Sequence, residues 1–284
     1  MKNNAQSKDF RMFTNVRGWS SGEEVTFFPR VTDATVMTLA VARWLATDPE
    51  HRKASFINIM TDLYSKHPEC EFSPIMNMWC KSEYFQPFRR DSNDVIARIS
   101  PIALKIDDLN EAIKLAKSAT EFTHKDPDSI KGAEVFTDAL WKAARGRSKE
   151  DIRFAVENDY GIDLNIPEQD LKSILMGAVK EDVIINGEPT GEVYYRDTGK
   201  IDYSTMNTLT AALKCFLEGN SFEDIVRRAV ALGGDSTTIA SVAGALAQAM
   251  HKDMPQEILS QCEKNIPSDL KNIMDSFEMS LSRR

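Results

Sequence analysis

The apolar residues of the chain recur mainly at helical spacing. Within residues 56–63, apolar side chains occupy positions i, i+3, i+4 and i+7, which lie on one face of a helix. The same spacing recurs within residues 109–116. Ser148 and Asp151 have the spacing of a capping box that begins another helix, and Gly161 is expected to end it. This pattern predicts an all-α protein.

Two further segments are apolar on nearly every side. They are residues 36–45, VMTLAVARWL, and residues 239–250, IASVAGALAQAM. A helix of this kind is buried all round. Because one such segment lies near each end of the sequence, we expect a single globular domain that closes around a central pair of helices.

Evidence for strands is confined to one place. Residues 183–185 precede Asn186-Gly187, a dipeptide typical of hairpin turns, and residues 192–195 could form the returning strand. We expect a minor local hairpin there. Long loops are expected at residues 1–31, 66–100 and 182–205. The predicted organisation is an irregular N-terminal segment, 1–31, followed by one helical domain, 32–284.

Charge and composition narrow the range of partners. The 284 residues include 35 Lys and Arg against 43 Asp and Glu, a net charge of -8, which disfavours nucleic acid as a partner. The sequence has no apolar run of about 18 residues and no apolar signal-peptide core, so we expect a cytoplasmic protein without membrane contact. The four cysteines lack C-x-x-C pairing and histidine at zinc-ligand spacing, which favours reduced, buried thiols.

One short motif has the spacing of a catalytic serine. Gly18, Ser20 and Gly22 match G-x-S-x-G, the nucleophile elbow, which requires a strand before the serine and a helix after it. Residues 23–29 favour an extended chain instead. We therefore expect a surface loop here and no nucleophile at Ser20.

Polar residues begin both of the strongly apolar segments. Residues 32–35 read Thr-Asp-Ala-Thr, and residues 233–238 read Gly-Gly-Asp-Ser-Thr-Thr. Each places a carboxylate and hydroxyls at a helix N-terminus, where either segment alone would be an ordinary N-cap. Together they are expected to converge on one cation or anion site. Oxygen ligands of this kind suit Mg²⁺ or Mn²⁺.

The same two segments resemble the signature segments of the ADP-ribosylglycohydrolases, relatives of the dinitrogenase reductase-activating glycohydrolase. The resemblance is carried by residues 32–45 and 221–250, continues through 92–104 and 123–134, and covers about residues 32–279. It implies a compact orthogonal helical bundle with a two-magnesium site. The implied reaction is hydrolysis of the glycosidic bond of ADP-ribose on modified proteins or small acceptors.

The resemblance also implies which residues would form the site. The metal ligands would be Thr32, Asp33, Asp235 and Thr238. The ligand-binding residues would be Asn93, Arg98, His124, Gly233, Gly234 and Ser236. Asp33 and Asp235 would be catalytic, assisted by Glu24 or by its neighbour Glu23, because a glutamate of the family has no other counterpart before residue 32.

Three departures from the family pattern bear on activity. Ala34 and Thr237 stand where the family has ligand aspartates, which leaves Asp33 and Asp235, a charge of -2, against the +4 of two magnesium ions. Burying that excess charge is costly, so at most one Mg²⁺ or Mn²⁺ is expected. Asp94 replaces a glycine near the ligand and is expected to repel a diphosphate.

The preferred interpretation is therefore a glycohydrolase-like protein whose activity is weakened or lost and which retains an ADP-ribose site. Two alternatives stay open. One is an active hydrolase that uses a single metal held by Asp33 and Asp235. The other is an inactive interaction protein that binds ADP-ribose, an ADP-ribosylated protein, or a protein partner such as an ADP-ribosyltransferase.

Overall fold

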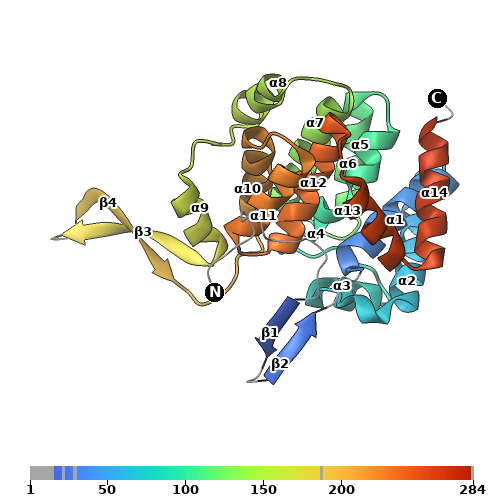
Figure 1. Cartoon of the computed structure of the whole chain (residues 1–284), viewed down its shortest axis with the longest axis horizontal. Helices are drawn as coiled ribbons and strands as arrows, with labels where there is room; N and C mark the ends of the chain where they lie inside the picture. Colours follow the sequence, from blue (N-terminus) through green and yellow to red (C-terminus); the bar gives the residue numbers. More distant parts are fainter. Residues whose placement is uncertain (1–15, 21–22, 28–30, 186–187, 283–284) are drawn as a thin grey trace.

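The computed structural model describes residues 16–20, 23–27, 31–185 and 188–282. Helices dominate these residues, and two antiparallel hairpins project from the helical body (Figure 1). The elements are β1 (Val16–Ser20), β2 (Glu23–Phe27), α1 (Asp33–Thr47), α2 (Lys53–Lys66), η1 (Pro68–Cys70), α3 (Pro74–Cys80), α4 (Asp94–Arg98), α5 (Ser100–Lys105), α6 (Leu109–Glu121), α7 (Pro127–Ala144), α8 (Lys149–Phe154), η2 (Ala155–Asp159), α9 (Glu168–Leu175), β3 (Ala178–Ile185), β4 (Glu188–Asp197), α10 (Thr205–Glu218), α11 (Phe222–Leu232), α12 (Ser236–His251), α13 (Gln256–Asn265) and α14 (Ser268–Ser282).

The helices form two groups that meet at the short helix α4. Helix α12 packs against α7, α10 and α11, whereas α1 packs against α2, α5 and α14 (Figure 1). Helix α4 contacts both α1 and α12. Buried apolar side chains from both groups belong to one continuous core. The all-α fold and the shared core are thus confirmed.

Helices α1 and α12, the expected central pair, both bury most of their apolar residues, as their composition predicts. Helix α4 contacts both of them, and a cavity of about 190 Å³ is lined by residues of each. Apolarity alone predicts that a helix is buried but does not specify which helix covers it.

The structure contains two hairpins, of which the sequence predicted one. Strands β3 and β4 form the expected hairpin, which is longer than predicted; its turn, residues 186–187, lies outside the described residues. Strands β1 and β2 pair within the N-terminal segment that was expected to be irregular. Because β2 follows Ser20 where a nucleophile elbow needs a helix, the structure does not support a serine nucleophile. The expected loop 66–100 contains η1, α3 and α4.

Local signals in the sequence are reproduced by the backbone. Ser148 and Asp151 form the predicted capping box at the start of α8, and Gly161 adopts a φ of 67° after the π-turn η2 that follows this helix. The four cysteines are unpaired, and Cys70 and Cys215 are buried. Within the described residues, no helix combines the length and the apolarity that crossing a bilayer requires.

Candidate active site

A cavity of about 590 Å³ opens where the N-terminal ends of α1 and α12 meet α4 and the turn before α3. Asp33 and Asp235 both line it, so the predicted convergence of the two helix starts is confirmed. The side chains used in the argument below are Thr32, Asp33, Ala34, Cys70, Ser73, Arg90, Asn93, Asp94, Arg98, Tyr203, Asp235, Thr237 and Thr238.

Asp33 is the first residue of α1, and its carboxylate is held by backbone N–H groups. One oxygen accepts a hydrogen bond from the N–H of Ala34 at 2.8 Å, and the other accepts one from the N–H of Ser73 at 3.2 Å. Burial, together with the nearby negative charge of Asp94, raises the pKa of Asp33 from 3.8 to about 6. The charged form of Asp33 is therefore disfavoured in this cavity.

Asp94 brings a third carboxylate to the cavity. It begins α4, and its Oδ2 accepts a hydrogen bond from the Ser73 hydroxyl at 2.6 Å. The charge count based on Asp33 and Asp235 alone is therefore too low, since four aspartates, Asp33, Asp91, Asp94 and Asp235, line this space together with Glu71. No periodic signal in the sequence places residue 94 beside residue 33; the contact depends on how α4 packs against α1.

Asp235 occupies the N-cap of α12 and is tied to α4 by Asn93. The side-chain amide of Asn93 donates to Oδ2 of Asp235 at 2.9 Å, and the N–H of Thr238 approaches Oδ1 at 3.4 Å. The second amide hydrogen of Asn93 goes to the hydroxyl of Thr208 at 3.0 Å. Asn93 is buried, so it joins the starts of α4 and α12 to helix α10 and fixes the position of the Asp235 carboxylate.

Two positions of the lining lack the carboxylates that the family resemblance implies, because Ala34 and Thr237 stand there. Among the described residues, Asp33, Asp94 and Asp235 do not bring three carboxylate oxygens within 4.8 Å of one another. The three aspartates that do gather within this distance are Asp91, Asp126 and Asp128, of which Asp91 lines the cavity. The raised pKa of Asp33 shows that added positive charge would be stabilised beside it.

Several predicted residues lie away from the cavity. Gly233, Gly234 and Ser236 do not line it. Gly234 has a φ of 62°, and a Cβ atom there would lie 2.8 Å from the Cβ of Leu175, so a close approach of two backbones explains this glycine. The ligand contacts expected of these three residues remain predictions with no geometric support.

His124 is also placed differently from its predicted role. It is fully buried, its Nδ1 lies 2.9 Å from the Thr123 hydroxyl, and it does not line the cavity. Burial lowers the pKa of His124 to about 3, so the ring is neutral. Arg98 does line the cavity, but its guanidinium donates to the Thr123 hydroxyl and approaches the sulfur of Met76. His124 therefore supports the pocket wall and not a ligand.

The remaining predicted residues divide between the cavity and the N-terminal hairpin. Thr32 and Thr238 line the cavity, although the Thr32 side chain makes no capping hydrogen bond. Glu23 and Glu24 lie in strand β2, and their side chains fall outside the described part of the structure. Their proposed help in catalysis stays a prediction.

Sequence reasoning missed several lining residues, among them Arg90 and Tyr203. Arg90 is exposed, and Tyr203 leaves 55% of its surface accessible. Arg90 lies between α3 and α4 and Tyr203 between β4 and α10, where no apolar period singles out a position. An exposed arginine and an exposed aromatic ring are suited to a phosphate group and to a planar base, respectively.

Comparisons with known proteins agree with this architecture. A model of the ADP-ribosylglycohydrolase family matches residues 3–284, which includes the N-terminal segment that the sequence resemblance left out. The chain is 22% identical over 269 residues to ADP-ribosylhydrolase ARH3 of Gallus gallus, a match that covers 82% of this chain and 73% of that protein. A solved structure described as an ADP-ribosylglycohydrolase-related protein complex shares the fold, with a TM-score of 0.64 at 22% identity over 99% of this chain and 92% of the other. The chain therefore belongs to the ADP-ribosylglycohydrolase family.

Proposed function

We propose that the cavity binds ADP-ribose, free or attached to a protein, and that hydrolysis of its glycosidic bond is weak or absent. The observation that carries this proposal is the presence of Ala34 and Thr237 in the lining, where the family resemblance implies two aspartates. The family acts on ADP-ribosylated substrates, which supports the choice of ligand.

The proposed binding mode follows from the lining residues. The guanidinium of Arg90 offers paired N–H donors to the diphosphate, and the ring of Tyr203 offers an apolar face to the adenine. Asn93 holds the Asp235 carboxylate through a hydrogen bond of 2.9 Å, so Asp235 is positioned to accept hydrogen bonds from ribose hydroxyls. Carboxylates alone would repel the diphosphate, so binding depends on the positive charge that Arg90 adds to the lining.

A single Mg²⁺ or Mn²⁺ fits beside Asp33 and Asp94. When bound, such an ion supplies charge stabilisation and orientation for the ribose hydroxyls. A second ion would need carboxylates at the positions of Ala34 and Thr237, because Asp91, the fourth aspartate of the lining, already accepts hydrogen bonds from Ser129 and Thr205. The template that a two-metal site supplies for an attacking water is therefore incomplete, which is the reason for the expected loss of rate.

Two assays on the full chain test the proposal together. Calorimetry with ADP-ribose should show binding, and release of ADP-ribose from peptides modified on serine or arginine should be slow or undetectable in saturating Mg²⁺. Asp33→Asn and Asp235→Asn should each abolish any residual turnover, whereas Ser20→Ala should not. Turnover within tenfold of a family member that keeps its aspartates would contradict the proposal.

The alternative of a pure interaction protein gives a different result in the same assays. Neither binding of ADP-ribose nor turnover would then be seen. The polar lining of the cavity, with four aspartates and Arg90, favours a small charged ligand over an unoccupied remnant. An ADP-ribosyltransferase or another protein as partner remains part of that alternative.

A further inference from the structure

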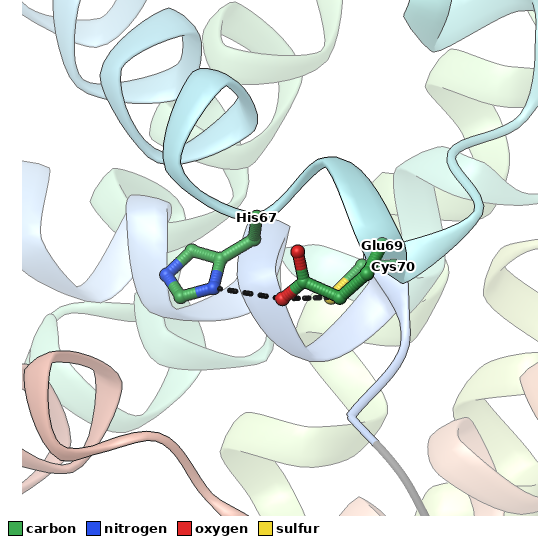
Figure 2. A group of neighbouring side chains, drawn as sticks. All are labelled: His67, Glu69 and Cys70. Carbon is green, nitrogen blue, oxygen red and sulfur yellow. Dashed lines mark hydrogen bonds and ion pairs between the residues drawn. The ribbon is translucent and has the colours of Figure 1, made fainter.

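The chain contains a second group of possible metal ligands on a different element. His67 follows the last residue of helix α2 as its C-cap, and the next turn, η1, carries Glu69 and Cys70. One ligand atom from each of these side chains lies within 4.8 Å of the others. Figure 2 shows the carboxylate of Glu69 between the imidazole of His67 and the thiol of Cys70.

We propose that His67, Glu69 and Cys70 bind one Zn²⁺ ion. The donor set contains an imidazole nitrogen, a carboxylate oxygen and a thiol sulfur, all of which zinc accepts, whereas magnesium prefers oxygen ligands alone. The sequence analysis favoured reduced, buried thiols, because it found no histidine at zinc-ligand spacing. The turn η1 brings the three groups together in spite of that spacing.

Asp269 supplies the orientation that a zinc-binding histidine needs. Its Oδ2, in the first turn of α14, lies 2.9 Å from Nε2 of His67. In the zinc-bound state, Nε2 would donate to this carboxylate, while Nδ1 lies on the side of Glu69. A carboxylate behind the histidine is a usual companion of zinc sites.

His67 and Cys70 both approach the same oxygen of Glu69. Nδ1 of His67 lies 3.4 Å from Oε1 of Glu69, and the sulfur of Cys70 lies 3.9 Å from the same oxygen. An ion held by all three groups would require a neutral imidazole and a thiolate, so the protons of His67 Nδ1 and Cys70 would pass to solvent on binding.

Burial favours a defined site with one open position. His67 and Cys70 are buried, whereas the Glu69 side chain is 65% exposed, so an ion can enter from the Glu69 side and keep a water there. Three protein ligands with one open position is a usual zinc arrangement. Cys70 also lines the cavity described above, so the ion would fix part of its wall.

Titration of the full chain with Co²⁺ in excess Mg²⁺ tests this proposal. Co²⁺ replaces Zn²⁺ and reports a thiolate ligand by a charge-transfer band in the near ultraviolet, while Mg²⁺ occupies the oxygen donors of the cavity. We expect one Co²⁺ per chain, displaced by Zn²⁺. Cys70→Ser should abolish the band, and Cys80→Ser, the matched control outside the cluster, should retain it.

Two further variants guard against misfolding as an explanation. Glu69→Gln changes an exposed side chain and should weaken Zn²⁺ binding at least tenfold. Asp269→Asn should keep the band and weaken affinity by roughly 10- to 100-fold, as expected of a residue behind a ligand. A wild-type chain without the band, or a band that survives Cys70→Ser, would overturn the proposal.

Discussion

The carboxylates of Asp33 and Asp94 are held by the same residue, Ser73. The backbone N–H of Ser73 donates to Asp33 at 3.2 Å, and its hydroxyl donates to Asp94 at 2.6 Å. Two negative groups are thereby fixed near one another at the start of α1 and α4. Burial and then the charge of Asp94 raise the pKa of Asp33, although the hydrogen bond from Ser73 lowers it, so a cation beside the two carboxylates would be favoured.

Replacing Asp33 should stabilise the metal-free protein at neutral pH. The pKa of Asp33 is about 6 in the folded state against 3.8 ordinarily, so ionisation opposes folding above about pH 6 and has no such effect below about pH 4. Asp33→Asn should raise the free energy of unfolding at pH 7 by at most about 3 kcal/mol. Urea unfolding in EDTA at pH 7 and pH 4 checks this. An equal change at both pH values would contradict the assignment.

Removing the charge of Asp94 should have opposite effects with and without metal. In EDTA, Asp94→Asn should tighten ADP-ribose binding by roughly tenfold, because a like charge is lost while the carbonyl oxygen of the new side chain can still accept from Ser73. In Mg²⁺ the variant should lose the dependence of binding on the ion. Asp163→Asn, at an exposed position outside the cavity, serves as the control. Unchanged affinity in EDTA would mean that Asp94 does not face the ligand.

Arg90 should contribute to diphosphate binding. Arg90→Ala should weaken ADP-ribose binding by about tenfold, since a charge-assisted hydrogen bond contributes about 1.5–3 kcal/mol and this side chain is exposed. Arg89→Ala is the matched control, because Arg89 is also exposed and does not line the cavity. Calorimetry measures both. If the two variants bind equally, the diphosphate lies elsewhere.

We expect Gly234 to have a structural role in the fold. Gly234→Ala introduces a Cβ atom 2.8 Å from Leu175 at a φ of 62°, which should lower the free energy of unfolding by about 2–4 kcal/mol. Gly146→Ala has a similar φ of 73° with open space around the new atom and should cost only about 1 kcal/mol. Thermal unfolding of both proteins separates the clash from the backbone strain. Equal losses would show that the contact with Leu175 relaxes freely.

Features that depend on residues close together in the sequence could be predicted from the sequence. Helical periodicity, the capping box of Ser148 and the cap at Gly161 are set by interactions within one or two turns. The polar starts of α1 and α12 also signalled the cavity that contains Asp33 and Asp235.

Features that depend on packing between distant segments could not be predicted. The contact of Asp94 with Ser73 spans 21 residues, and the bond of His67 with Asp269 spans 202. Resemblance to a motif likewise does not specify which way a side chain points. His124 is an example: it stands at a helix start that resembles the family's, yet it is buried and does not line the cavity.

The number of divalent ions bound per chain tests the central claim most directly. Mn²⁺ binding should be counted by paramagnetic resonance in a Cys70→Ser background, which removes the separate zinc cluster. The account predicts at most one ion, and two ions after Ala34→Asp is combined with Thr237→Asp, because the pair restores the missing carboxylates. Two ions bound without these substitutions would contradict the account.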